Sequence, residues 1–511
     1  MKRLLSTLAC LTALLNGCAS LPERPEILPQ SSMPPGTDAP LDRAVAGAEA
    51  EHAGQAGFRL VIEGMEAFVI RAQSATLAAR SLDVQTYIWH DDATGRYLAR
   101  VLLAAADRGV RVRLLVDDLD ARAKNVGFGA LNAHPHIEVR LFNPFATRSG
   151  GLRLAGEGLR DFGRVNRRMH NKSWIADNRI ALVGGRNLGD EYFTASDVVN
   201  FVDLDFAMVG PVVRDVSASF DRFWNSASAW PMELLDASVV NEAALKSLRA
   251  RLDEYTAGAR QGEYARALRE NDGIRRLVAG DWALRWSSKY RFVSDDPAKV
   301  TMQKKDASRA AVAAAVVEEL RKTRSSTEII SPYFVPGDAG SDLLVSRAQA
   351  GAQVQVLTNS LAANDVASVH GGYSRHRKAL LEGGVQLFEL KPLAQGAPSS
   401  SFTGSSGASL HTKALTVDGN ASFVGSYNLD PRSTWLNCEQ GVLVEDTELA
   451  AQLSAIFRKQ SDGNRAWKVT LEGGELHWND GQEMHASDPG ASGWRKFQAW
   501  FARAFHLDAQ L

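Results

Sequence analysis

The sequence contains one arrangement of polar residues twice. In the first copy, MHNKSWIADNRIALVGGRN, Lys172 follows His170 by two positions and Asp177 follows it by seven. The second copy, LHTKALTVDGNASFVGSYN, has the same residue types at the same spacing: His411, Lys413 and Asp418. Each copy runs on to an asparagine 17 residues after its histidine, Asn187 or Asn428. A duplication that preserved only a fold would not need these polar residues, so we interpret the copies as halves of one active site.

These residue types suit the transfer of a phosphoryl group. A histidine and a lysine two apart on a strand point to the same face. Lysine and asparagine donate hydrogen bonds to phosphoryl oxygens. One imidazole can attack phosphorus while the other protonates the departing alcohol and deprotonates the incoming one. A phosphodiester needs one of each, which accounts for two copies, and we expect neither a metal nor a cofactor. A single His-x-Lys pair is more often structural, so the prediction depends on the duplication.

Each histidine also needs an acceptor that fixes its tautomer. Glu439 lies 28 residues after His411, and the matching stretch of the first half, VNFVDLDFAMV, offers Asp203 and Asp205. Aligning Asp205 with Glu439, we expect these two carboxylates to orient the histidines. The alternative is that they are solvated carboxylates at strand edges.

The elements around the motifs repeat as well. Helix and strand patterns alternate over residues 64–118 and recur over residues 308–360, and the Gly109 turn aligns with the Gly351 turn. Each motif is predicted to form a β-hairpin, with Asp177-Asn178 or Asp418-Gly419 in the turn. The order of elements predicts an α/β fold of two pseudosymmetric lobes, each a sheet flanked by helices, with the site at their interface.

Composition and length agree with this organisation. The chain has 511 residues, 45% of them hydrophobic, and a formal net charge of −1, so no global field favours nucleic acid. With Cys10 in the apparent signal and Cys18 a lipidation candidate, Cys438 has no disulfide partner, and no zinc-type spacing occurs. We expect lobes at residues 45–230 and 286–470, joined by a helical connection at 231–285 in which we find no chemistry.

The N-terminus is typical of an exported lipoprotein. Lys2 and Arg3 precede a short apolar run that ends in LNGC, which resembles a bacterial lipobox. We expect residues 1–18 to be a signal peptide that leaves Cys18 acylated; the alternatives are an ordinary secretory signal or an uncleaved anchor. Ala19 after the cysteine favours the outer membrane, within a cell envelope location facing the periplasm. Residues 19–44 are Pro-rich and predict an extended, semi-rigid tether.

Two further segments allow two interpretations each. Six arginines between residues 148 and 168 either attract anionic lipid headgroups or form ordinary salt bridges. The tail, residues 471–511, ends in an amphipathic helix with aromatic residues Trp494, Phe497, Trp500, Phe501 and Phe505. This helix either lies in a membrane interface or, as we favour, covers the core of the second lobe.

Longer segments resemble a known family. SPYFVPG (331–337) and GSYNLDPRSTWLNCE (425–439) are similar to segments of bacterial cardiolipin synthases in the phospholipase D superfamily. RVNRRMHNK, VGGRNLGDEYF, DLDFAMVGP and DDPAK resemble the subgroup known as cardiolipin synthase C. The resemblance covers roughly residues 50–470.

The resemblance implies phospholipase D-type lobes and assigns roles to residues. His170 would be the nucleophile and His411 the general acid and base, while Lys172, Lys413, Asn187 and Asn428 would bind phosphate. Asp177 and Asp418 belong to the catalytic motif, although they hold the turn.

The implied activity is phosphatidyl transfer, through a phosphohistidine, to phosphatidylglycerol, giving cardiolipin. The expected partners are phospholipids, phosphatidylglycerol and also phosphatidylethanolamine, and a membrane reached through the lipid anchor. The alternatives are a hydrolytic phospholipase D that releases phosphatidic acid, a nuclease of the superfamily and a non-catalytic binding protein.

Overall fold

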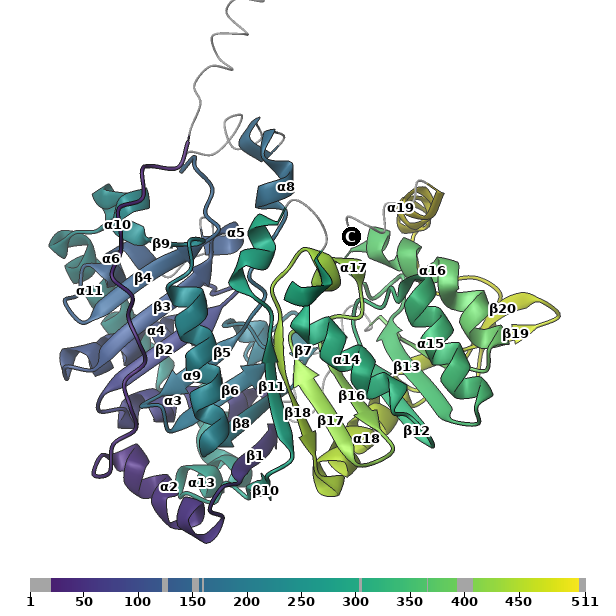
Figure 1. Ribbon diagram of the computed structural model, residues 1–511, viewed down its shortest axis with the longest axis horizontal. Coiled ribbons are helices and arrows are strands. Elements are labelled where there is room, and N and C mark those ends of the chain that lie inside the picture. The colour runs from purple at the N-terminus through teal and green to yellow at the C-terminus, as the bar shows by residue number, and fades with distance from the viewer. Residues whose placement is uncertain are drawn as a thin grey trace, which may run out of the picture.

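Two α/β lobes lie side by side in the computed structural model (Figure 1). The structure describes residues 20–121, 127–148, 156–158, 160–302, 306–364, 366–392 and 408–504. Within these ranges the strands form one large sheet in each lobe and a two-stranded sheet between the lobes. Cys18 and the expected signal peptide lie outside the described residues.

The sheet of the first lobe has nine strands in the order β10-β1-β8-β6-β5-β2-β3-β4-β9. Their bounds, in that order, are β10 Arg285–Ser287, β1 Ala56–Val61, β8 Asp205–Val209, β6 Ile180–Gly184, β5 Ser173–Ala176, β2 Ser81–Thr86, β3 Arg111–Asp117, β4 Ile137–Phe142 and β9 Ala229–Pro231. Strands β2, β3 and β4 are parallel and the other neighbours pair antiparallel.

The sheet of the second lobe has ten strands in the order β11-β18-β17-β16-β12-β13-β14-β19-β20-β21. Their bounds, in that order, are β11 Tyr290–Ser294, β18 Gln440–Glu445, β17 Ala421–Gly425, β16 Ala414–Val417, β12 Ser326–Ile330, β13 Gln353–Asn359, β14 Gln386–Leu390, β19 Ala466–Glu472, β20 Glu475–Asn479 and β21 Met484–His485. Here β12, β13 and β14 are the parallel strands. From β1 to β9 and from β11 to β19 the two orders correspond, which confirms the predicted α/β fold of two pseudosymmetric lobes.

Helices cover both sheets, and α9 crosses the near face of the first one in Figure 1. In the first half of the chain the α-helices with fully described bounds are α2 Pro40–Glu51, α3 Gly64–Leu77, α4 Ala93–Asp107, α5 Asp118–Ala121, α6 Phe128–Asn132, α8 Phe162–Val165, α9 Pro211–Trp224 and α10 Met232–Leu235. The rest are α11 Glu242–Ala259, α12 Glu263–Glu270, α13 Asp272–Val278, α14 Ala311–Arg321, α15 Gly337–Gln349, α16 Ala367–Glu382, α17 Pro431–Trp435, α18 Thr447–Ser461 and α19 Gly493–Ala504.

Local chemistry fixes the equivalent helices α4 and α15. The Asp92 side chain accepts a hydrogen bond from Gly95 N at the start of α4. The turns after the two helices contain Gly109 with φ 91° and Gly351 with φ 98°, a conformation that favours glycine. Each helix therefore turns back into the next parallel strand, as the sequence predicts.

One apolar cluster continues from lobe to lobe. It contains Phe206 and Val216 from β8 and α9 together with Val442 and Leu453 from β18 and α18, all at most 2% exposed. The lobes are therefore packed against each other through a shared core, which fixes the position of any site built between them.

The Pro-rich segment has no regular secondary structure from residue 20 to 39, as an extended segment should, but it is docked along the first lobe, and Pro40 already begins α2. Arg24 Nη2 donates to the carbonyl oxygens of Ser226 and Ala229, at 3.0 and 3.1 Å. Further along, Ser32 N donates to Asp221 Oδ2 at 2.8 Å. The segment descends across the lobe to α2, as Figure 1 shows. Prolines favour the extended conformation, and these hydrogen bonds attach it to the lobe.

The part of the chain described by the structure has no helix with the length and hydrophobicity needed to cross a bilayer.

Candidate active site

His170 lies where the first lobe meets the second. The residues just before β5 pair with residue 438 of the second lobe, and His170 N donates to Cys438 O at 2.8 Å. The next residue of that partner strand is Glu439, and its Oε2 lies 2.9 Å from His170 Nδ1. The ring of His170 thus takes its acceptor from the opposite lobe, which leaves Nε2 available for chemistry.

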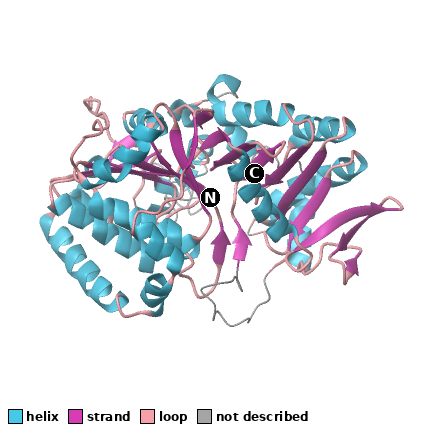
Figure 2. Cartoon of the chain, turned by 90° about the horizontal axis from the view of Figure 1, so that it is seen from below, coloured by secondary structure: helices cyan, strands magenta, loops and turns pink. Residues whose placement is uncertain are grey.

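His411 has the corresponding arrangement with the roles of the two lobes exchanged. The short strand β15 (Ala408–Leu410) pairs in parallel with β7 (Asn200–Val202) of the first lobe, and His411 N donates to Val202 O at 3.0 Å. The residue after Val202 is Asp203, whose Oδ2 lies 2.6 Å from His411 Nδ1. Figure 2 shows this two-stranded pair between the lobes.

The expectation that Asp205 orients a histidine is therefore wrong, and Asp203 occupies that position. Asp205 forms ion pairs with Arg71 at 2.9 Å and Arg186 at 3.3 Å. The strand register explains the error, because Gly184 pairs with Asp205 whereas its counterpart Gly425 pairs with Gly441. By this register Asp203 corresponds to Glu439.

The two motif lysines are buried beside the histidines. Lys172 is 3% and Lys413 is 1% exposed, and each Nζ donates to the carbonyl oxygen of the histidine two residues before it. Burial lowers the pKa of both histidines, and the charges of both lysines lower it further because the two motifs lie in one site. This arrangement concentrates positive charge where a phosphate would bind.

The two asparagines differ from each other. Asn187 Oδ1 accepts from Ile88 N at 3.2 Å, and its Nδ2 donates to the Tyr192 hydroxyl at 2.8 Å. Asn428 is 5% exposed, and its Oδ1 has no hydrogen-bond partner among the described residues. The side-chain oxygen of Asn187 is thus occupied by a hydrogen bond, whereas that of Asn428 is not.

Comparison with known proteins places the chain in a family. The profile of the cardiolipin synthase, PLD-like domain matches residues 72–224 and 316–461, which include both motifs. The chain belongs to the cardiolipin synthase family of phospholipase D-like proteins. It is 42% identical over 458 residues to cardiolipin synthase C of Escherichia coli, covering 87% of this chain and 94% of that one.

Two more proteins extend the family comparison. An uncharacterized protein of Helicobacter pylori is 30% identical over 472 residues, which is 92% of this chain and 91% of that one. The phosphatidylserine synthase of Haemophilus influenzae has a similar fold, with a TM-score of 0.56 at 14% identity, covering 92% of this chain and 100% of that one.

The histidines of this cardiolipin synthase family member differ in their electrostatic environment. The pKa of His170 is well below its ordinary value because burial disfavours the charged form and the motif lysines add positive charge. Burial and Lys413 also lower the pKa of His411, but Asp203 acts in the opposite direction. Burial acts to raise the pKa of Asp203, yet the charge and hydrogen bond of His411 bring it below the usual range. Burial raises the pKa of Glu439 to about 7. His170 is thus more readily kept neutral, as a nucleophile must be, and His411 is the more readily protonated of the two.

Asp177 and Asp418 lie at the far ends of the strands that follow the histidines, and they contact backbone. Asp177 accepts hydrogen bonds from the amides of Ala79, Arg80 and Ser81 at 2.7–2.9 Å. Asp418 accepts from the amides of residues 324–326 at 2.8–3.1 Å. Both occupy hairpin turns with positive φ, 52° and 53°. Grouping them with the catalytic residues is therefore wrong: they position the strands, as their place in the turn indicates.

Aromatic rings beside the histidines were not predicted as site residues. The Tyr87 ring packs edge-on to His170 at 5.1 Å, and Lys172 Nζ lies 5.2 Å from the same ring. Phe201 stacks on His411 at 5.3 Å, and Tyr192 packs edge-on to it at 5.3 Å. Tyr87 directly follows β2, and its approach to His170 could not be predicted from the spacing of residues.

Residues around Glu439 hold this carboxylate from several sides. Ser426 Oγ donates to Glu439 Oε2 at 2.5 Å. Asp295 Oδ2 accepts from Glu439 N at 3.0 Å and forms a 2.7 Å ion pair with Lys299. The DDPAK and LDPRSTWLNCE segments singled out in the sequence therefore meet around the partner of His170. The counterpart of Ser426 is Gly185, where a Cβ would lie 2.1 Å from Asp203 Oδ1.

Most of the described arginines before His170 form internal contacts. Arg148, Arg164 and Arg168 pair with Asp118, Glu157 and Asp117 at 2.6, 2.9 and 3.0 Å. Arg160 is exposed beside Asp161, at 3.2 Å, and Arg153 lies outside the described residues. The salt-bridge interpretation of this stretch is the one the structure supports.

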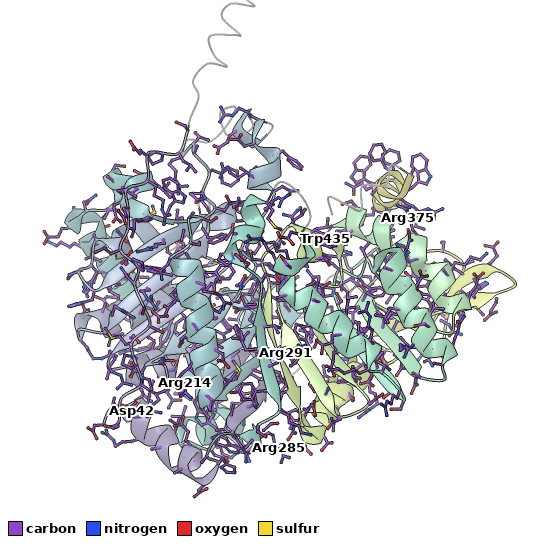
Figure 3. All side chains as sticks on the ribbon, viewed as in Figure 1. Asp42, Arg214, Arg285, Arg291, Arg375 and Trp435 are labelled. Carbon is purple, nitrogen blue, oxygen red and sulfur yellow. The ribbon has the colours of Figure 1, made fainter. Side chains whose placement is uncertain are left out.

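The expectation that the aromatic residues of α19 cover the second lobe is wrong. Trp494, Phe497, Trp500 and Phe501 are 66, 48, 57 and 42% exposed. Figure 3 shows the aromatic side chains of this helix extending away from the lobe. Small residues make the packing contact instead, because a Cβ at Gly371 of α16 would lie 2.4 Å from Ala499 O. Phe505 lies outside the described residues.

Proposed function

We propose that this protein is a phosphatidyltransferase that makes cardiolipin from phosphatidylglycerol through a phosphohistidine. The observation that carries the proposal is the pair of histidines, each with its Nδ1 atom bound to a carboxylate of the other lobe. Two buried lysines beside them suit a phosphodiester. The E. coli relative is named for cardiolipin synthesis.

The first step forms the covalent intermediate. Nε2 of neutral His170 attacks the phosphorus of one phosphatidylglycerol, and the bond from phosphorus to the glycerol headgroup oxygen breaks. Protonated His411 gives its Nε2 proton to that oxygen, so that free glycerol leaves. Glu439 accepts the Nδ1 hydrogen bond of His170 and balances the positive charge that develops on its ring.

The second step transfers the phosphatidyl group. The terminal hydroxyl of a second phosphatidylglycerol gives its proton to His411 and attacks phosphorus, and the bond to His170 breaks. The products are cardiolipin and the enzyme in its starting protonation state. Water can attack instead, giving phosphatidic acid, so transfer requires that the acceptor lipid be held in place.

Product analysis tests the proposal. Purified protein is incubated with phosphatidylglycerol vesicles, alone and with phosphatidylethanolamine, and the lipids are separated by chromatography. We expect cardiolipin and free glycerol with the wild type and neither with His170→Ala or His411→Ala. Phosphatidic acid without cardiolipin would establish the hydrolytic alternative. Products unaffected by either substitution would exclude catalysis at these histidines.

We also propose that the protein works at a membrane surface of the cell envelope, facing the periplasm. The lipobox-like LNGC sequence supports acylation of Cys18, and Ala19 after this cysteine supports a slight preference for the outer membrane. The first described residues and α19 lie along the same edge of the molecule in Figure 1, so both could face one membrane. The aromatic face of α19 matches an interfacial helix.

A further inference from the structure

A large cavity lies behind the strand that positions His411. It encloses about 1080 Å³, at the upper end of the roughly 300–1,000 Å³ typical of ligand pockets. Its walls come from α3, the start of α4, the loop before β7, α11, α12 and α18. Helices of the connection between the lobes, to which the sequence assigned no chemistry, therefore form one wall.

The cavity and the active site share a wall. The Phe201 side chain lines the cavity, and its ring also stacks on the ring of His411 at 5.3 Å. Val202, which lines the cavity too, accepts the hydrogen bond from His411 N. An acyl chain of a lipid whose hydroxyl reaches His411 would have to pass Phe201 to enter the cavity.

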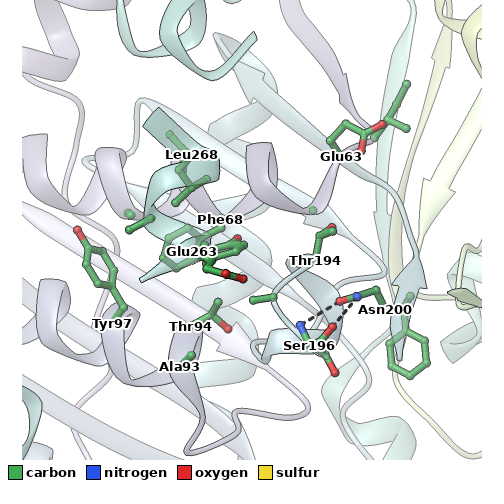
Figure 4. A pocket seen from close by; sticks show the side chains of 18 of the residues that line it. Glu63, Phe68, Ala93, Thr94, Tyr97, Thr194, Ser196, Asn200, Glu263 and Leu268 are labelled. Carbon is green, nitrogen blue, oxygen red and sulfur yellow. Dashed lines mark hydrogen bonds between the residues drawn. The ribbon is translucent and has the colours of Figure 1, made fainter. Parts of the chain in front are cut away.

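Apolar side chains make up much of the lining. Phe68 of α3 is 5% exposed and packs against Tyr97 at 5.4 Å, and Val69, Leu268 and Ile456 add aliphatic surface. Figure 4 shows Phe68, Leu268 and Tyr97 around the pocket. Hydrogen bonds between Ser196 and Asn200, at 3.1 and 2.8 Å, brace the loop on the side of β7 (Figure 4).

We infer that this cavity binds an acyl chain of the acceptor lipid, the one whose hydroxyl attacks the phosphohistidine. The inference rests on the proposed function, because it uses the assignment of His411 as the base that activates that hydroxyl. In-line displacement brings the acceptor to the face of phosphorus opposite His170, where His411 can take its proton, and Phe201 of the cavity lining stacks on His411. An apolar lining favours the burial of methylene groups over the entry of water. Exposed Arg260 and Arg269 in the lining suit an anionic lipid.

The cavity accounts for transfer over hydrolysis. An acceptor held by its acyl chain keeps its hydroxyl next to His411 while the phosphohistidine exists, which raises its effective concentration against water. Filling the cavity should consequently change which nucleophile attacks, and should affect formation of the phosphohistidine much less.

Two alanines of α12 provide a matched pair for the test. Ala265 lines the cavity, whereas Ala267 is not among the described residues that line it, and both are partly buried. With phosphatidylglycerol vesicles as substrate, we expect Ala265→Trp to lower the ratio of cardiolipin to phosphatidic acid by roughly fivefold or more. Total consumption of phosphatidylglycerol should remain within about threefold of wild type. Ala267→Trp should leave the ratio unchanged.

Other outcomes separate the cavity from the proposed function. An unchanged ratio in Ala265→Trp, or an equal loss in Ala267→Trp, would overturn the inference. If Ala265→Trp does not fold, Leu268→Asn replaces an apolar lining side chain by a polar one and is judged by the same ratio. If wild type makes neither product, the proposed function fails. Binding of pyrene-labelled phosphatidylglycerol then decides: weaker binding by Ala265→Trp than by Ala267→Trp supports an acyl-chain site, and equal binding overturns it.

Discussion

His411 in the second lobe has its Nδ1 atom 2.6 Å from Oδ2 of Asp203 in the first lobe. The converse pair, His170 and Glu439, crosses the interface in the opposite direction. Each lobe carries a whole motif, but the carboxylate that fixes the tautomer of its histidine comes from the other lobe. The site therefore exists when both lobes are folded and packed through their shared core.

Replacing Asp203 tests this relationship. Asp203→Asn keeps the size of the side chain but removes the negative charge that fixes the His411 tautomer and favours its protonated form. We expect kcat for phosphatidylglycerol to fall by about 10²–10⁴-fold, the scale on which a wrongly held catalytic histidine loses activity. The thermal unfolding temperature should change by only a few degrees.

Asp205 provides the control for this substitution. It lies two residues away and binds Arg71 and Arg186, so Asp205→Asn should lower the unfolding temperature through two buried, unpaired guanidinium groups. The folded fraction should keep most of its kcat. A loss of kcat in Asp205→Asn equal to that in Asp203→Asn, at matched folded fraction, would contradict the assignment.

The sequence predicted the repeated fold, the two histidines and Glu439, because these depend on patterns that are local or duplicated. It did not predict Asp203, because the segments between the hairpins and the carboxylates differ by five residues: Asp203 follows His170 by 33 positions and Glu439 follows His411 by 28. Asp203 and Asp205 lie two positions apart, and motif spacing could not decide which of them corresponds to Glu439. The register opposite Gly184 decides between them, and it is a property of the folded sheet.

The sequence also could not predict contacts between distant segments. The composition of the Pro-rich segment predicts an extended conformation whether or not the segment is docked. Its docking depends on the carbonyl groups of residues 226 and 229, which the sequence does not reveal. The periodicity of α19 fits burial or membrane contact equally well, and Gly371 of the neighbouring α16 decides which face packs. The connection between the lobes has no motif, and its role as a cavity wall appears in three dimensions.

Activity should depend on pH through groups that must carry a proton. Burial lowers the pKa of Lys172 to about 7, and the pKa of His411 lies below its ordinary value of 6.5. Both lose the proton as pH rises, so the free enzyme loses its general acid His411 first and then, near pH 7, the charge of Lys172. Glu439, whose pKa burial raises to about 7, ionises over the same range and only partly offsets these losses. We expect kcat/KM for phosphatidylglycerol to fall as pH rises through about 7. Measurements from pH 5.5 to 9, with a stability check at each pH, would contradict this if kcat/KM stayed constant to pH 9.

Asp177 should contribute to stability more than to catalysis. Asp177→Ala removes the acceptor of three backbone amides at the start of β2, and Asp177 is 0% exposed. We expect a loss of roughly 2–4 kcal/mol in unfolding free energy, measured by denaturant titration. Asp418→Ala, the equivalent change at a more exposed turn, should cost less. A normal unfolding midpoint together with abolished turnover in Asp177→Ala would instead give this residue a direct chemical role.

The exposed aromatic face of α19 should bind lipid. Trp494, Trp500 and Phe501 are 66, 57 and 42% exposed, and interfacial helices bury such residues at the boundary between headgroups and acyl chains. The triple substitution to alanine should weaken binding to phosphatidylglycerol vesicles by about tenfold or more in a flotation assay, with an unchanged melting temperature. Gln498→Ala, on an exposed position of the same helix, serves as the control and should bind normally. Normal vesicle binding by the triple variant, or a lowered melting temperature that accounts for the loss, would mean that this face does not hold the protein on the membrane.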